Sequence, residues 1–368
     1  MSGSIRRYDI DWLRVIAIGL LLIYHITIVF QPWGVFIGFI QSDKPLNSLW
    51  IPMSMLNVWR IPLLFFVSGM GVCFAIKKRN WKQLITERSR RILLPFIFGI
   101  FFIVPIHFLI WQFYYSQDVS YVLNRSHLWF LGNIFVYVLV LSPLFFYLKR
   151  IEGSLLGNKI KKLFGNPLGF LLILTSFVIE TFIVKIESFE LYAMTSHGFF
   201  LGLLAFLFGF LLIFSETYFW NSVLKWRWVL VIVASLLFSV RLFYFELVNA
   251  PNYLKAVESC FWVFTVFAFG YRYLNHQSKT LSYLSQGAYP IYIVHMIFLF
   301  LGSYLIIPLN IPTILKFILL IVFTIIGCFA LYEFIIKRVK ILRLFFGLKN
   351  EYSNTHLLNK LRINFNNN

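Results

Sequence analysis

The sequence predicts an all-α protein, a polytopic membrane helix bundle of about ten transmembrane helices with both termini in the cytoplasm. Of its 368 residues, 60% are apolar and only 13% are charged, whereas soluble globular chains carry about 25% charged residues. The mean hydropathy is +0.80. Long apolar runs recur along the whole chain, and basic residues gather in alternate connections between them. These three observations together predict the class.

Ten apolar runs are long enough to approach the roughly 20 residues that a helix needs to cross a bilayer. The first run continues well beyond a typical signal sequence and lacks a cleavage site, so it is predicted to be a retained helix. The ten runs cover approximately residues 12–30, 53–76, 92–111, 128–148, 168–184, 198–214, 228–245, 257–274, 285–306 and 313–336.

The orientation follows from the distribution of Lys and Arg. Most of the 33 basic residues lie near the two ends of the chain or after the second, fourth, sixth and eighth runs. Cytoplasmic loops are enriched in these residues, so both termini are predicted to be cytoplasmic. The net charge of +19 is thereby assigned to topology and to anionic membrane lipids, and a nucleic-acid partner is not expected. The alternate connections hold only Lys44, Arg125, Lys185, Arg241 and Lys255.

The chain is predicted to contain one functional domain. Residues 1–343 form the membrane-embedded part, and residues 344–368 form a polar, Asn-rich cytoplasmic tail that is predicted to be disordered. The three cysteines lie in separate apolar runs without a CxxC pair, which indicates neither a disulfide framework nor a metal site. The sequence carries no signal for an oligomeric state. No soluble catalytic domain is expected, so any chemistry is predicted to occur within the membrane bundle.

The first run contains two residues that are costly in a membrane helix, Arg14 and His25. At about 100° and 1.5 Å per residue they share one helix face, roughly 16 Å apart. Asp11 lies three residues before Arg14 and can pair with it. This face predicts a polar track across the membrane. Two simpler interpretations stay open: Arg14 as a cation that snorkels to the interface, and His25 as a hydrogen-bond donor between helices.

A second cationic element precedes the third run. Arg88 and Arg91 are separated by three positions just before Pro95, so they point the same way on a helix. Two guanidinium groups on one face can bind phosphates through forked hydrogen bonds. The alternative is that they enforce topology and contact lipid phosphates.

The second run contains Arg60 in its predicted outer half, followed by Pro62 and by a Ser68–Gly69 step. Proline and small polar residues in a membrane helix leave backbone groups that need other partners, which often line a cavity. A kink with close helix packing and no ligand is an equally good interpretation.

Further polar groups fall in the predicted outer half of the membrane. His127 and Trp129 open the fourth run, Glu180 lies in the fifth, and His295 lies in the ninth. Tryptophan at this depth is typically an interfacial anchor. His127 is interpreted either as a site residue or as a solvated loop residue, and His295 either as a site residue or as a hydrogen-bond donor in the core.

These groups are divided by depth, with arginines at the inner surface and histidines toward the outside. An anionic donor that docks from the cytoplasm and an acceptor that approaches from outside require such a division. A histidine without a metal suits general-base activation of a hydroxyl. A transporter or flippase that exports a polysaccharide or glycolipid without acyl transfer, or a membrane scaffold, fits the same span count.

Several sequence strings resemble the acyltransferase 3 family of integral membrane acyltransferases, and most closely its branch of glucans biosynthesis protein C. They are DIDWLRVIA and RIPLLFFVSG in the first two runs, the Arg88-x-x-Arg91 element, HLWFL after Ser126, and YPIYIVH ending at His295. Members also show a basic residue and then His in the first helix, as Arg14 and His25 do here. The resemblance extends from about residue 7 to about residue 337.

The resemblance implies an enzyme of the bacterial cytoplasmic membrane. It implies transfer of an acetyl or succinyl group from cytoplasmic acyl-CoA, a co-substrate rather than a bound cofactor, to a hydroxyl of an extracytoplasmic glycan. Carried over, His25 is the catalytic candidate, and Arg14, Arg88 and Arg91 are donor-binding candidates. The other polar residues are candidates for an acceptor-side or supporting role: Asp11, Arg60, His127, Trp129, Glu180 and His295.

Overall fold

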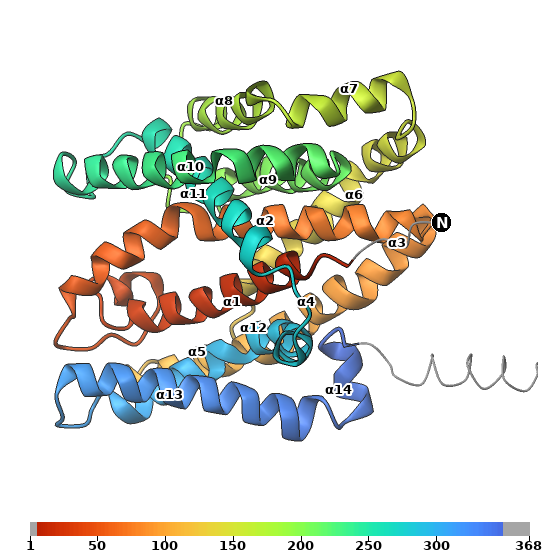
Figure 1. The fold of residues 1–368 in the computed structure, drawn as a ribbon. Coiled ribbons are helices and arrows are strands. Elements are labelled where there is room, and N and C mark those ends of the chain that lie inside the picture. Colours follow the sequence, from red (N-terminus) through yellow and green to blue (C-terminus); the bar gives the residue numbers. More distant parts are fainter. Residues whose placement is uncertain (1–5, 349–368) are drawn as a thin grey trace, which may run out of the picture.

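The computed structural model describes residues 6–348, and this part of the chain is built from helices without strands (Figure 1). Its longer helices run side by side across the molecule, and the shorter ones connect them at the two ends. The elements are α1 (Tyr8–Ile28), η1 (Gly34–Ile37), η2 (Asn47–Leu49), α2 (Trp50–Lys77), α3 (Trp81–Arg88), η3 (Ser89–Leu93), α4 (Leu94–Phe98), η4 (Gly99–Ile103), α5 (Val104–Tyr114), η5 (Ser126–Leu128), α6 (Trp129–Arg150), α7 (Leu155–Phe164), α8 (Pro167–Ile183), α9 (Ser196–Phe214), α10 (Thr217–Phe243), α11 (Asn252–Tyr273), α12 (Lys279–Ile306), α13 (Thr313–Leu331), η6 (Tyr332–Ile336) and α14 (Lys340–Phe345).

The predicted helix bundle is confirmed. Within residues 6–348, nine helices are long and apolar enough to cross a membrane, and the bent pair α7–α8 makes up to ten. The bend of 78° lies at Asn166 and Pro167, where proline occupies the first turn of α8, a position at which its missing N–H is not needed. The predicted fifth run corresponds to α8, and the other nine runs correspond to the nine long helices.

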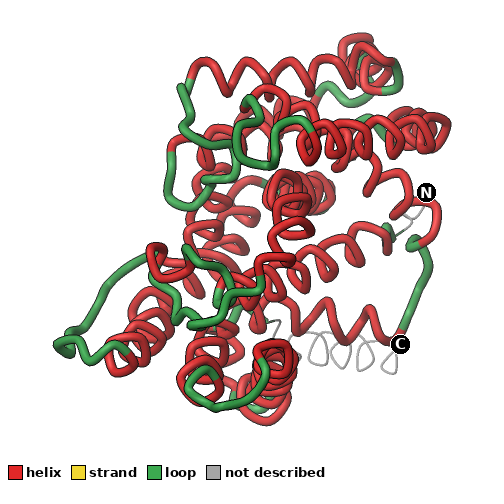
Figure 2. Tube along the Cα trace, turned by 90° about the vertical axis from the view of Figure 1, so that its left-hand side faces the viewer, coloured by secondary structure: helices red, strands yellow, loops and turns green. Residues whose placement is uncertain are grey.

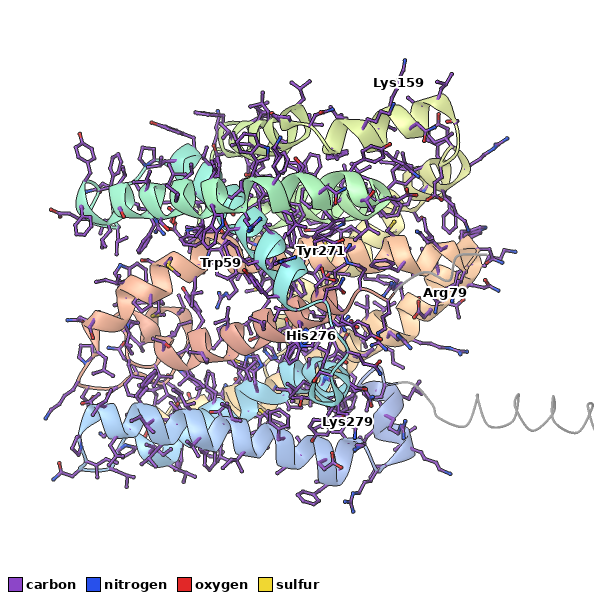
Figure 3. All side chains as sticks on the ribbon, in the orientation of Figure 1. Trp59, Arg79, Lys159, Tyr271, His276 and Lys279 are labelled. Carbon is purple, nitrogen blue, oxygen red and sulfur yellow. The ribbon has the colours of Figure 1, made fainter. Side chains whose placement is uncertain are left out.

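The connections gather at the two ends of the bundle. Figure 2 faces the left-hand end of Figure 1, where long loops join α1 to α2, α5 to α6 and α8 to α9. The basic connections after α2, α6 and α11 lie toward the other end, where Arg79, Lys159 and Lys279 are labelled in Figure 3. The assignment of this basic end to the cytoplasm stays a prediction. The predicted domain boundary after residue 343 falls inside α14, and residues 349–368 of the predicted tail lie outside the described residues.

The centre of the bundle is a close crossing of α2 and α9. A Cβ atom on Gly69 would lie 1.9 Å from the carbonyl oxygen of Phe206, and one on Gly209 would lie 2.0 Å from that of Phe66. Small residues allow membrane helices to approach until their backbones touch. The Ser68–Gly69 step therefore provides close packing at Gly69, while Ser68 satisfies its own hydroxyl by donating to the Leu64 carbonyl at 2.7 Å.

Replacement of Gly69 by Ala is expected to destabilise the protein by about 1–3 kcal/mol, because a Cβ must displace a backbone carbonyl of the neighbouring helix. Thermal unfolding of the detergent-solubilised variant measures the effect. Gly19→Ala is the matched control, since a Cβ on Gly19 meets no atom within 4 Å. Equal melting temperatures for the two variants would contradict this role of the crossing.

A buried ion pair fastens α10 to α11 near the end opposite the basic connections. The Arg241 guanidinium donates to the Glu258 carboxylate at 2.6 and 2.9 Å, and it donates to the Ser54 carbonyl of α2 at 3.0 Å. Both side chains are fully buried. Because an unpaired charge in a protein interior is costly, the pair holds three helices together, a role that the sequence alone did not reveal.

Candidate active site

A cavity of about 640 Å³ opens among the helices near the basic end of the bundle. Residues of α1, α2, α6 and α12 form its apolar and hydroxylated walls, and cationic residues stand around it. The lining residues are Arg6, Asp11, Arg14, Ile18, Leu64, Val67, Ser68, Gly71, Val72, Arg88, Arg91, Ile92, Phe130, Leu131, Ile134, Ser282, Ser285, Gln286, Tyr289, Tyr292, Tyr332, Lys337, Arg343, Phe346, Gly347 and Leu348.

The three arginines that the sequence singled out meet in this cavity. Arg14 reaches it from α1, and Arg88 and Arg91 reach it from the junction of α3 with the π-helical turn η3. Glu87 lies beside both of the latter, with its carboxylate 3.3 Å from Nη1 of Arg91 and 4.0 Å from Nε of Arg88. The predicted common direction of Arg88 and Arg91 is confirmed. The cavity is therefore strongly cationic at this end.

Asp11 pairs with Arg14, as the spacing predicts, at 2.8 Å between Oδ1 and Nη2. Its second oxygen lies 3.0 Å from Nη2 of Arg6. One carboxylate thus bridges two of the cavity's cations. Among the described residues, six basic side chains line the cavity and Asp11 is the single acidic lining residue, so this part of the chain gives the cavity an excess of positive charge that suits an anionic ligand.

Tyr292 lies between the cavity and a cluster of histidines. Its ring lines the cavity, and its hydroxyl donates a hydrogen bond to the backbone carbonyl of His127. Its own backbone carbonyl accepts a hydrogen bond from Nδ1 of His295 at 2.6 Å. One lining residue of the cavity therefore also holds two of the predicted site histidines by hydrogen bonds.

His25 and His295 form a hydrogen-bonded pair between α1 and α12. Nδ1 of His25 lies 2.8 Å from Nε2 of His295, and the two rings are nearly parallel. The Tyr292 carbonyl can only accept, so Nδ1 of His295 carries a proton. In neutral His295 the Nε2 atom is then an acceptor, and Nδ1 of His25 must donate to it. The lone pair of neutral His25 is consequently placed on its Nε2 atom.

That Nε2 atom has no hydrogen-bond partner among the described residues, and the His25 side chain is only partly buried. Phe39, from the loop that follows α1, stands beside the imidazole with ring centroids 5.9 Å apart. His25 is thus oriented on one side by His295 and left with a basic nitrogen on the other. This is the arrangement that a general base requires.

Two further histidines complete the cluster. His127 is buried, donates from Nε2 to the Ile293 carbonyl at 3.0 Å, and has a buried Nδ1 without a partner in the described part of the chain. Its ring lies edge-on to that of His295 with centroids 5.0 Å apart. His107 of α5 lies next to His127 at 5.7 Å. Sequence reasoning missed His107, because nothing near it in the chain is polar.

Arg60 does not line the cavity. Its guanidinium stacks on the Tyr24 ring at 3.8 Å and donates to Asn57 at 3.3 Å. Only 3% of the residue is exposed, and Nε and Nη1 have no hydrogen-bond partner in the described part of the chain. Arg60 therefore holds unsatisfied cationic donors beside Tyr24, the residue that precedes His25 in the chain.

The loop that joins α8 to α9 contacts α2 close to Arg60 in the chain. Tyr192 of this loop is buried, and its hydroxyl donates to the Val58 carbonyl of α2 at 3.1 Å. Burial raises the pKa of the Tyr192 hydroxyl well above its ordinary value, so it remains a neutral donor. This contact ties the loop to the helix that carries Arg60.

Three of the predicted site residues lie in surroundings that the sequence did not indicate. Trp129 is buried against Phe65, with ring centroids 6.0 Å apart; the expectation of an interfacial anchor is wrong, because α6 turns this residue toward α2. His127 is likewise buried, which excludes a solvated loop residue. Glu180 is 2.9 Å from Nδ1 of His197, and it lines neither the cavity nor the histidine cluster.

No group of histidine, cysteine or acidic residues within residues 6–348 has the arrangement of a metal site. The cavity and the histidine pair instead offer cationic donors, an apolar passage and an oriented nitrogen base. Such a set can bind an anionic molecule at one end and accept a proton at the other. This set of groups suits the transfer of a group between two substrates.

The sequence was compared with models of known protein families. The model of an acyltransferase domain, that of acyltransferase 3, matches residues 7–333, which is most of the chain. Comparisons with curated proteins and with solved structures gave no match. The matched region contains every helix that carries the histidine cluster and the arginines Arg14, Arg88 and Arg91. The chain therefore belongs to the acyltransferase 3 family.

Proposed function

We propose that this protein transfers an acyl group from acyl-CoA, bound at the basic end of the bundle, to a hydroxyl of a glycan that enters from the opposite end. The observation that supports this proposal is the path from the cationic cavity to Tyr292 and on to the His25–His295 pair. It joins a cationic cavity to an oriented base within one bundle.

The donor is assigned by charge and shape. Coenzyme A carries several phosphates on its nucleotide part and a long, uncharged arm that ends in the thioester. Arg14, Arg88 and Arg91 suit the phosphates because guanidinium groups bind them through paired hydrogen bonds. The arm then fits along the apolar wall of Ile18, Leu64 and Phe130, with the thioester directed toward Tyr292.

The proposed reaction uses His25 as the base. Nε2 of His25 takes the proton of the acceptor hydroxyl while the hydroxyl oxygen attacks the thioester carbonyl carbon. Collapse of the tetrahedral intermediate breaks the carbon–sulfur bond, and the departing thiolate of coenzyme A receives the proton from the His25 imidazolium. An ester and free coenzyme A result, and His25 is again neutral.

Arg60 supports the same step. Negative charge develops on the thioester oxygen during the attack, and preorganised donors in a dry site stabilise such charge strongly. The Nε and Nη1 groups of Arg60 are buried without partners in the described part of the chain, next to Tyr24 and His25. We assign them to this oxygen.

The acceptor and the acyl group are proposed from the resemblance to family members of the bacterial cytoplasmic membrane. A glycan hydroxyl on the outer side is the proposed acceptor, and an acetyl or succinyl group is the proposed cargo. The position of Arg60 and the histidine cluster away from the basic end agrees with an acceptor that enters from that side. Anionic lipids at the basic connections are proposed as the remaining partners.

The deciding experiment uses the purified full-length protein in lipid nanodiscs with labelled acetyl-CoA or succinyl-CoA and envelope glycans as acceptors. Mass spectrometry of the glycans is expected to show the acyl group as an ester, with one coenzyme A released per ester formed. A transporter would move glycans without consuming the donor, so donor consumption without protein-dependent esters, or no consumption at all, would overturn the proposal.

Replacement of Arg88 and Arg91 by Gln is expected to raise the dissociation constant for acyl-CoA by roughly 10- to 100-fold, because each charge-assisted hydrogen bond is worth about 1.5–3 kcal/mol. Equilibrium binding of the labelled donor measures it. Arg90→Gln is the matched control, since Arg90 lies in the same turn but is exposed and does not line the cavity. Unchanged donor affinity in the double variant would remove both arginines from the site.

A further inference from the structure

The segment Lys337–Leu348 lies beyond the family-matched region, which ends at residue 333, and yet it forms part of the cavity wall. Five of its residues line the cavity together with Arg14, Arg88 and Arg91. Two of the five are cationic, so this segment adds to the positive charge that faces the cavity. The five are Lys337, Arg343, Phe346, Gly347 and Leu348.

Aromatic packing holds this segment in place. The Phe345 ring stacks on Phe98 of α4 with centroids 4.8 Å apart, and the Phe346 ring meets Phe98 edge-on at 5.6 Å. Phe346 is almost fully buried. The short helix α14 is therefore seated against the third membrane-crossing stretch of the chain, the same stretch that presents Arg88 and Arg91.

Gly347 brings the segment against the backbone of the arginine-bearing turn. Its φ of +66° lies in the left-handed region that favours glycine. A Cβ there would lie 2.7 Å from the carbonyl oxygen of Arg91 and 3.1 Å from the ring of Tyr289. Both the conformation and the space require glycine, so Gly347 sets the distance between the segment and Arg91.

We propose that the segment Lys337–Leu348 is a donor-binding element, in which Arg343 contacts a phosphate of the donor across the cavity from Arg88 and Arg91. This inference rests on the proposed function, since it assigns one more contact to the same donor. Lys337 is held by Glu333 at 2.9 Å and adds charge to the rim. Arg343 is the phosphate ligand of the segment.

The charges around the cavity support this assignment. Cations from α1, from the α3–η3 junction and from the C-terminal segment converge on one space, where they repel one another. Within residues 6–348, three carboxylates, those of Asp11, Glu87 and Glu333, pair with cations of this group, whereas six basic side chains line the cavity. A molecule with phosphates at more than one position, as coenzyme A has, contacts cations on several walls at once. Arg343 gives such a molecule a contact that the family-matched region does not supply.

The test measures binding of coenzyme A and of 3′-dephospho-coenzyme A to the full-length protein in nanodiscs of zwitterionic lipid. Arg343→Gln is expected to weaken coenzyme A binding about tenfold. Gly347→Ala is expected to weaken it to a similar degree, because the added Cβ pushes the segment away from Arg91. Arg338→Gln is the control, since Arg338 belongs to the same segment but is exposed and does not line the cavity.

The outcomes separate this inference from the proposed function. If the unmodified protein binds neither form of coenzyme A, the proposed function fails. If it binds coenzyme A and Arg343→Gln binds equally well, the assignment of Arg343 fails while the proposed function stands. An effect of Arg343→Gln that appears only in nanodiscs of anionic lipid assigns Arg343 to lipid phosphate and overturns the inference. The unmodified protein is expected to prefer coenzyme A over its dephospho form. Loss of this preference in Arg343→Gln supports the inference and identifies the 3′-phosphate as the group that Arg343 contacts.

Discussion

Replacement of His25 by Ala is expected to lower the rate of acyl transfer by roughly 10²- to 10⁴-fold, the usual contribution of a general base. The acceptor hydroxyl then keeps its proton, and no other base among the described residues offers an oriented nitrogen at the same place. Donor binding is expected to be unchanged, because the arginines of the cavity remain. The loss therefore falls on kcat and not on the affinity for acyl-CoA.

The measurement is single-turnover transfer from labelled acyl-CoA at saturating donor. His276→Ala is the control, since His276 is exposed in the loop between α11 and α12, where Figure 3 labels it, and does not line the cavity. Acyl transfer at a near-normal rate in the His25→Ala protein would show that His25 only lines the path.

Because the base must be neutral, the rate of the unmodified protein is expected to fall as the pH is lowered.

Replacement of His295 by Leu is expected to lower kcat by roughly 10- to 100-fold, similar to the loss of an orienting partner of a metal-binding histidine. His295 accepts the hydrogen bond from Nδ1 of His25 and thereby places the His25 lone pair on Nε2. Without this acceptor, the His25 ring is free to turn and to carry its proton on either nitrogen. The affinity for acyl-CoA is expected to remain the same.

His295→Gln is the informative companion variant. The side-chain oxygen of Gln reaches about where Nε2 of His295 lies and can accept the same hydrogen bond, so most of the rate is expected to return. If His295 served packing alone, His295→Leu would keep a higher kcat than His295→Gln, because Leu suits a fully buried position better than Gln. Equal kcat values for His295→Leu and His295→Gln would refute a positioning role.

Features that depend on local spacing could be predicted from the sequence. The apolar runs correspond to the observed long helices, since hydropathy over about 20 residues reflects what a bilayer requires of any helix. The pairing of Asp11 with Arg14 and the shared direction of Arg88 and Arg91 followed from positions three apart on one helix. These contacts do not depend on how the helices pack.

Features that depend on pairing between distant segments were missed or misjudged. His107 looked unremarkable in α5 but lies next to His127, and Trp129 is turned into the core. The ion pair of Arg241 with Glu258 joins two helices across a loop. In each case the residue type did not show toward which neighbour the side chain points. Packing against neighbouring helices decides which side of a membrane helix faces protein and which faces lipid.

Hydropathy and residue spacing were enough to predict the long helices and the chemical groups that they carry, including His25 and the arginines of the basic end. The reason is that the bilayer imposes the same length and hydropathy on every span, whatever its neighbours. The packing of the helices brings His295 to His25, places Tyr292 between this pair and the cationic cavity, and makes Lys337–Leu348 part of the cavity wall. Those contacts join residues far apart in the chain, so they depend on helix crossings such as that of Gly69 with α9.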